Sequence, residues 1–142
     1  MVWKYLIDTT ALTEALHTIS VRGYRDSDAV YTAVVERTFF VDQTVPNVSI
    51  DTPASGSYIK GIVDFTGTSQ DDTGVDRVDL SFDGGSTWQT VTGTTSWSHS
   101  LASTALADGA ITVIARALDL SEPPLSGTIS IPVVIDNNNP TI

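Results

Sequence analysis

The chain of 142 residues has no cysteine, few basic residues and no long apolar run, and each absence excludes a class of function. Without cysteine there are no disulfides, no thiolate metal sites and no thiol catalysis. Lysine and arginine number 7 against 17 acidic residues, which gives a net charge of −10. The basic residues form no cluster, so we expect no nucleic-acid partner. No apolar run reaches the roughly 18 residues of a membrane helix, so we expect no membrane insertion.

The residues of catalytic centres are also scarce. His17 and His99 are the only histidines and stand far apart in the sequence, so the pattern offers neither a metal set nor a catalytic triad. Helical periodicity is nearly absent, and no glycine-rich phosphate loop opens a helix. The sequence therefore predicts a protein that is not an enzyme and that needs no cofactor, with calcium left as one open alternative.

The chain does contain a repeat. Residues 3–48 align with residues 97–142 at a constant offset of 94 without a gap, and nine of these 46 pairs are identical. Average composition would give about three identities by chance. The identical pairs are Trp3/Trp97, Thr10/Thr104, Ala11/Ala105, Leu12/Leu106, Thr18/Thr112, Arg22/Arg116, Ser27/Ser121, Asp42/Asp136 and Pro46/Pro140. A period of this length predicts about one and a half units of a tandem array.

Short runs of Val, Ile, Thr and aromatic residues, separated by Gly, Asp, Asn, Ser and Pro, predict strands along the whole chain. From Arg77 onward, the alternation places Val78, Leu80 and Phe82 on one inward face. About seven strands without helices over about 95 residues are typical of an all-β, immunoglobulin-like β-sandwich. The expected strands are 48–51, 58–67, 75–82, 87–91, 95–101, 110–119 and 127–135 in the full unit, and 3–7, 17–24 and 31–41 in the half-unit.

Several stretches resemble the bacterial Ig-like tandem repeats of large secreted or cell-surface proteins. In such repeats a DG turn precedes the penultimate strand, as Asp108-Gly109 does here, and an Asp with a Pro four residues later joins one repeat to the next, as Asp136 and Pro140 do. The half-unit departs from the pattern at Ala15-Leu16, where the DG turn is lost. The resemblance implies an extracellular or cell-surface location. It rests on residues 81–88, 106–109, 115–119 and 134–140, with 11–14, 21–24 and 40–46 in the half-unit.

The repeat and the resemblance together predict an unequal domain organisation. We expect residues 46–142 to form a complete Ig-like sandwich and residues 1–45 to supply the last three strands of another. An open three-stranded sheet would expose an apolar face and a free edge. The missing strands would come either from sequence upstream or from another polypeptide by strand complementation. The expected partners are therefore neighbouring Ig-like repeats or identical subunits.

The sharpest local motif spans residues 81–88. Ser81, Asp83, Gly85, Thr87 and Trp88 match the Asp-box pattern best known from sialidase propellers. We expect a structural hairpin in which the Asp83 carboxylate accepts backbone N–H groups, Gly85 takes a positive φ and Trp88 packs beneath the turn.

The acidic residues offer the one plausible ligand chemistry. Asp71 and Asp72 crowd one turn, and Asp119 and Asp136 are expected near the domain ends, where oxygen ligands could hold Ca²⁺ between successive modules. The alternative is that these four are ordinary turn residues, because Asp readily bonds its own backbone.

The sequence predicts a core that contains Trp3, Trp97, Leu106 and Val113. The expected function is that of a non-enzymatic structural module, acting as a stalk, spacer or filament-forming element. The alternative is an adhesin or carbohydrate-binding module attached to a larger surface protein or enzyme. That alternative predicts exposed aromatic residues, for example Tyr58 or Trp88.

Overall fold

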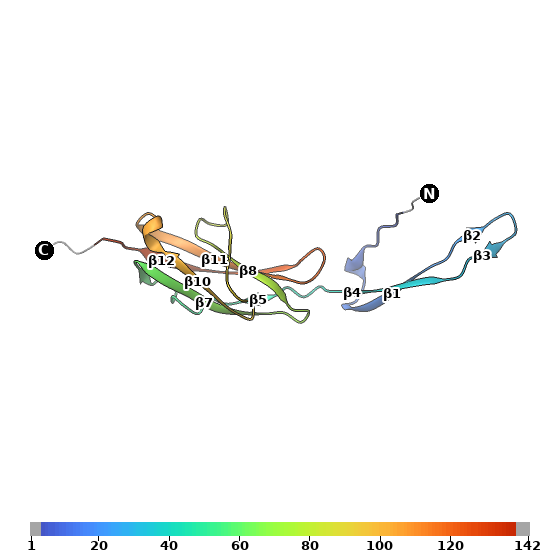
Figure 1. Cartoon of the computed structure of the whole chain (residues 1–142), viewed down its shortest axis with the longest axis horizontal. Helices are drawn as coiled ribbons and strands as arrows, with labels where there is room; N and C mark the ends of the chain where they lie inside the picture. Colours follow the sequence, from blue (N-terminus) through green and yellow to red (C-terminus); the bar gives the residue numbers. More distant parts are fainter. Residues whose placement is uncertain (1–3, 139–142) are drawn as a thin grey trace. The chain divides into compact units, whose positions relative to one another are not determined.

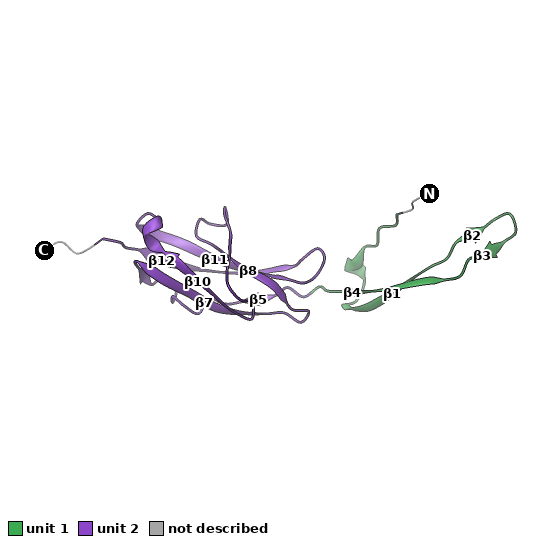
Figure 2. Cartoon of the chain, viewed as in Figure 1, with its two compact units in different colours: residues 1–43 green, residues 44–142 purple. Residues whose placement is uncertain are grey.

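The computed structural model describes residues 4–138 and divides the chain into two compact units, Met1–Gln43 and Thr44–Ile142 (Figures 1 and 2). Unit 1 and unit 2 are described separately below. Apart from two short 3₁₀ turns, residues 4–138 form strands and loops. Within this range no helix is long and apolar enough to cross a membrane.

Unit 2 is a β-sandwich, which confirms the predicted fold class. One sheet has three strands in the order β10-β7-β5, and the other has five in the order β6-β12-β11-β8-β9. The ladders are antiparallel except for the parallel pair β6 and β12. The elements are β5 (Asn47–Val48), β6 (Tyr58–Ile59), β7 (Ile62–Gln70), β8 (Val75–Ser81), β9 (Gln89–Thr90), β10 (Ser96–Ala102), the 3₁₀ turn η2 (Ser103–Ala105), β11 (Gly109–Asp119) and β12 (Ser126–Ile135).

Alternation along the strands builds the core of unit 2, because every second side chain points to the same face of a sheet. Phe65 on β7 and Leu80 on β8 are fully buried. Of the four predicted core residues, Trp97 and Val113 are 2% and 0% exposed, and Leu106 is partly buried against the same cluster. Trp3 lies outside the described residues.

The predicted strand 58–67 is in fact two strands in different sheets. Tyr58–Ile59 pairs with β12, whereas Ile62–Gln70 pairs with β5 and β10. Gly61 lies between them with a φ of +69°, a conformation that a residue with a side chain rarely adopts. The glycine thus lets the chain cross from one sheet to the other.

Unit 1 contains the 3₁₀ turn η1 (Thr9–Ala11) and two small antiparallel ladders, one between β1 (Ala15–Val21) and β4 (Val35–Val41) and one between β2 (Tyr24–Arg25) and β3 (Val30–Tyr31). The prediction of a strand at 3–7 was wrong for its described residues, since 4–7 form no strand. The equivalent residues of unit 2 lie in β10, which pairs with β7. A strand needs such a neighbour, and unit 1 has no counterpart of β7 among its described residues.

Elements of the two units correspond at the same offset of 94 that relates their sequences. The turns η1 and η2 are each closed by an equivalent backbone bond of 3.0 Å, from Leu12 N to Thr9 O and from Leu106 N to Ser103 O. The β1–β4 ladder pairs residues 15–21 with 41–35, and the β11–β12 ladder pairs 109–115 with 135–129. Unit 1 therefore reproduces the register of the last two strands of unit 2.

Candidate functional site

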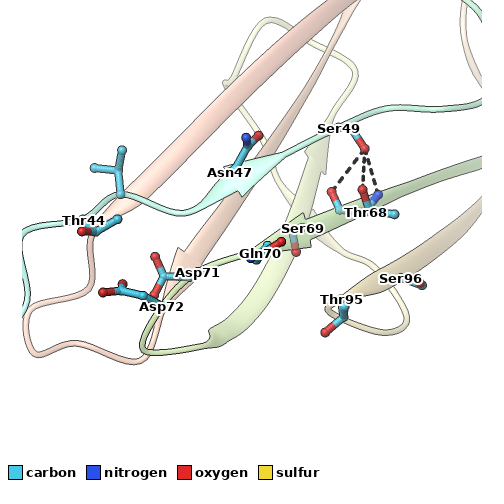
Figure 3. Close-up of a pocket in the computed structure, with 11 residues that line it drawn as sticks. Thr44, Asn47, Ser49, Thr68, Ser69, Gln70, Asp71, Asp72, Thr95 and Ser96 are labelled. Atoms are coloured by element: carbon cyan, nitrogen blue, oxygen red, sulfur yellow. Dashed lines mark hydrogen bonds between the residues drawn. The ribbon is translucent and has the colours of Figure 1, made fainter.

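A polar groove of about 680 Å³ lies on unit 2 along β5, β7 and the start of β10 (Figure 3). Two of its hydroxyl groups contact each other, since Ser49 Oγ lies 2.9 Å from Thr68 Oγ1, and Ser49 Oγ also donates to Asp51 Oδ1 at 2.9 Å. None of its lining residues is aromatic or basic. The groove therefore offers no ring on which a sugar could stack and no positive charge to hold an anion.

Asp71 and Asp72 line one end of this groove (Figure 3). Asp71 follows β7, and the turn of residues 71–74 leads into β8. Asp119, the last residue of β11, pairs with Val75 at the start of β8. This register brings a carboxylate oxygen of Asp71 within 4.8 Å of one of Asp119. Asp119 is 1% exposed, whereas Asp72 is an exposed residue.

Asp136, the fourth predicted calcium ligand, does not join this pair. It follows Ile135, which pairs with Gly109 at the first residue of β11, whereas Asp119 is the last residue of that strand. The two aspartates thus lie at opposite ends of β11 and cannot share one ion. Asp136 instead accepts the backbone N–H of Asn138 at 3.2 Å, as an ordinary turn residue does.

Hydrogen bonds around Asp83 close the hairpin between β8 and β9. The Asp83 carboxylate accepts the backbone N–H of Thr87 at 2.8 Å, the Thr87 hydroxyl at 2.6 Å and the Ser81 hydroxyl at 2.8 Å. Gly85 has a φ of +90° and donates its N–H to Ser81 Oγ at 2.8 Å. The bonds from Thr87, followed by that from Ser81, lower the pKa of Asp83 to about 2. The side chains of Ser81, Asp83 and Thr87 thus bond within the turn, as a structural hairpin requires.

Trp88 lies outside the core, against the guanidinium of Arg116, whose Cζ is 4.0 Å from the ring centroid. Arg116 in turn donates to Asp79, with its Nε 3.1 Å from Oδ2, and Asp79 also accepts the Thr90 hydroxyl at 2.7 Å. Asp79 is 2% exposed and forms a second ion pair, with Arg77 at 3.3 Å.

Burial of Asp79 raises its pKa, but the hydrogen bonds from Thr90 and Arg116 and the charges of Arg116 and Arg77 outweigh that effect and leave the pKa below its ordinary value. Sequence analysis missed this network. The sequence places Asp79 and Arg116 on two predicted strands, and only the pairing of β8 with β11 in the register Arg116↔Asp79 brings them into contact.

The remaining candidate residues are separate from one another. His99 lies beside Phe82 and His17 beside Phe39, each with ring centroids 5.8 Å apart, and His17 Nε2 lies 2.8 Å from Thr13 O. Each histidine therefore has a packing role in its own unit. Tyr58 is 76% exposed on unit 2.

Comparison with known proteins agrees with this architecture. Residues 46–115 match the family model of the bacterial Ig domain. No curated protein matches the chain.

Two solved structures share the fold. An endo-β-1,4-mannanase from Thermotoga petrophila aligns with a TM-score of 0.58 and 16% identity over 68% of this chain, which spans only 21% of the mannanase. Fibronectin(III)-like modules of CbhA from Clostridium thermocellum align with a TM-score of 0.52 and 20% identity over 63% of this chain and 94% of theirs. At these identities the likeness shows the fold alone. With the family match and the sandwich of two sheets, unit 2 is a bacterial Ig-like domain.

Proposed function

We propose that the chain is a non-enzymatic segment of an extracellular tandem-repeat protein, in which Ig-like sandwiches act as a stalk, spacer or filament-forming element. The observation that carries this proposal is the correspondence of unit 1 with the end of unit 2 at one offset, in sequence and in strand register. Repeat arrays are built from such copies of one structural unit. The family match supports an extracellular location, since bacterial Ig-like domains typically occur in secreted and cell-surface proteins.

Unit 1 lacks the neighbours that its counterpart has. In unit 2, β11 pairs with β12 on one side and with β8 on the other, whereas β1 pairs with β4 alone among the described residues of unit 1. Unit 1 also leaves many apolar side chains in solvent, namely Tyr5, Leu6, Ile7, Leu16, Tyr24, Val30, Tyr31, Val34, Val35 and Phe40, which are 42–78% exposed. A free strand edge beside exposed apolar side chains favours the addition of further strands.

The missing part has a defined chemistry, because unit 2 contains its counterpart in residues 44–96. There, β8 brings Asp79 to Arg116. Arg22 is the equivalent of Arg116 in unit 1 and already lies over an aromatic ring, with its Cζ 3.9 Å from the centroid of Tyr31. We infer that the covering segment is the first half of an Ig-like repeat, and that its equivalent of β8 places an acidic residue opposite Arg22.

The proposal is tested by supplying that half. Residues 44–96 of this chain, copied before residue 3, recreate the junction found in unit 2. Hydrogen exchange then measures the amides of β1 and β4. We expect their exchange to slow at least about tenfold when the added strands pair with β1. The matched control is the same extended chain with Val78→Asp in the copied segment, which should leave β1 exchanging as in the original chain.

A charged side chain at Arg37 on β4 could itself prevent the added strands from packing, so the extended chain is also tested with Arg37→Ile. If exchange at β1 and β4 stays unchanged in that variant as well, the proposal is contradicted. That variant supplies the apolar side chain which Ile131 provides at the equivalent, 8% exposed position of unit 2. Sedimentation of the original chain separates two sources of the missing strands. A concentration-dependent oligomer that becomes monomeric on extension would identify identical subunits as the partners.

A carbohydrate-binding role is the second candidate. It is favoured by the exposure of the Tyr58 ring, on which a sugar could stack. It predicts that the chain is retained on insoluble mannan or cellulose and that Tyr58→Ala abolishes this retention, with Tyr24→Ala in unit 1 as the control. No retention on either polysaccharide would leave the structural role as the single candidate.

A further inference from the structure

Two aspartates of unit 2 each hold a buried carboxylate oxygen that nothing satisfies. Asp71 Oδ1 and Asp119 Oδ2 are both inaccessible to solvent and have no hydrogen-bond partner. The carboxylates approach within 4.8 Å of each other at the end of the sandwich where the turn of residues 71–74 meets the end of β11. A buried charge is normally paired with an opposite charge or bound to a metal ion. Here the fold instead places two negatively charged carboxylates, those of Asp71 and Asp119, close to each other.

The other oxygen of each carboxylate is held firmly by its own loop. Asp119 Oδ1 accepts the backbone N–H groups of Ser121 at 3.0 Å and Leu125 at 2.9 Å, and the Ser121 hydroxyl at 2.6 Å. Asp71 Oδ2 accepts the backbone N–H of Thr73 at 2.9 Å and its hydroxyl at 2.7 Å. These five bonds fix the direction of both carboxylates, and they do so without involving the orphaned oxygens.

The three basic residues of unit 2 form no described ion pair with Asp71 or Asp119. Arg77 and Arg116 form their ion pairs with Asp76 and Asp79. Lys60, the one other basic residue of unit 2, follows Ile59, which pairs with Ile135 near the opposite end of β11. A chain of net charge −10 adds a negative field that favours uptake of a cation from solution.

We propose that Asp71 and Asp119 bind a divalent cation, with Ca²⁺ as the preferred ion. Calcium takes oxygen ligands at 2.3–2.6 Å, so a single ion can bridge two oxygens that are up to about 4.8 Å apart. Calcium also accepts six to eight ligands in flexible geometry, so water entering from the groove that Asp71 lines would complete the coordination. With two protein carboxylates, the affinity should lie in the range of extracellular calcium modules, a Kd of about 10⁻⁴–10⁻³ M. This site is a property of unit 2 and does not depend on the proposed structural function.

Thermal unfolding of the full chain in EDTA and in 10 mM CaCl₂ tests the site. We expect Ca²⁺ to raise the Tm of the wild type by several degrees, since the ion binds the folded state alone. Asp71→Asn should abolish this response and should melt above the wild type in EDTA, because it removes one of two like charges while an amide oxygen can still accept the Thr73 bonds. Glu122→Gln is the matched control: it removes an exposed charge in the loop after Asp119 and should respond to Ca²⁺ as the wild type does.

Amide chemical shifts locate the ion independently of stability. Titration of the ¹⁵N-labelled chain with CaCl₂ should move the amides of Thr73, Ser121 and Leu125, which are bonded to the two carboxylates, and leave that of Thr87, which is bonded to Asp83. The proposal would be overturned if 10 mM Ca²⁺ changed neither the Tm of the wild type nor these three amide shifts. An undiminished Ca²⁺ response in Asp71→Asn would do so as well, and an equal response to MgCl₂ would contradict the preference for calcium.

Discussion

We expect Trp97→Ala to lower the free energy of unfolding of unit 2 far more than Trp88→Ala does, although both tryptophans belong to the same domain. Trp97 is 2% exposed, and it pairs with Gly67 on β7. A Cβ atom at Gly67 would overlap Trp97 Cζ2, so the absence of a side chain at this position makes room for the ring. Trp97→Ala therefore opens a cavity that its glycine neighbour cannot fill.

The magnitude follows from burial. A buried tryptophan removes about 150–250 Å² from water, which at about 25 cal/mol per Å² gives roughly 4–6 kcal/mol. Trp97 Nε1 is buried without a hydrogen-bond partner, and such a group costs about 1–3 kcal/mol. The difference between these two ranges centres on about 3 kcal/mol, which is the loss of stability that we expect for Trp97→Ala. Trp88→Ala removes a half-buried ring and its contact with Arg116, and should cost about 1 kcal/mol.

Urea unfolding followed by far-ultraviolet circular dichroism measures both losses. With a slope of about 1.5 kcal/mol per M, the expected loss for Trp97→Ala lowers the midpoint by about 2 M, and that for Trp88→Ala lowers it by less than about 1 M. Trp97→Phe keeps most of the ring and removes the orphaned N–H, so its loss should be well below that of the alanine variant. Equal midpoints for the two alanine variants would refute the assignment of Trp97 to the core and of Trp88 to the surface network.

Two further predictions concern the charged groups of the five-stranded sheet. Asp79→Asn should destabilise unit 2 by about 1–3 kcal/mol because it leaves Arg116 without its ionised partner, and a double-mutant cycle with Arg116→Met should show that the two losses are not additive. The pKa of Asp83 is lowered to about 2 in the folded state from an ordinary value of 3.8, so its ionised form adds stability above about pH 4 that is lost as the pH falls toward 2. The Tm difference between the wild type and Asp83→Asn should therefore shrink over that interval, and a difference that stays constant from pH 5 to pH 2 would contradict the bonding described for this hairpin.

The sequence predicted those features of the fold that depend on local pattern. Alternation along residues 78–82 placed Val78 and Leu80 in the core, and the fixed offset of 94 anticipated equivalent elements such as η1 and η2. Local pattern does not carry strand register, however. The contact between Asp79 and Arg116 and the approach of Asp71 to Asp119 both depend on how β8 aligns with β11, and neither was predicted as a pair.

Two other differences between the predicted and the observed strands also arise from long-range strand pairing. The run 58–67 was predicted as one strand although Gly61, a poor strand former, interrupts it, and the positive φ of that glycine lets its two parts enter different sheets. Residues 4–7 align with β10 but form no strand in unit 1, because strand structure needs a neighbour that propensity cannot supply.

The parallel pairing of β6 with β12 decides how unit 2 would carry tension. The chain enters the five-stranded sheet at β6 and leaves it at β12, and the two strands run side by side in the same direction. Force that separates the two ends would slide these strands past each other. It would then load together the bonds from Gly56 N to Pro132 O at 2.7 Å, from Val134 N to Ser57 O at 2.9 Å and from Asp136 N to Ile59 O at 3.0 Å. Bonds loaded in shear must break together, so the short ladder between β6 and β12 would be the part of the domain that resists stretching most.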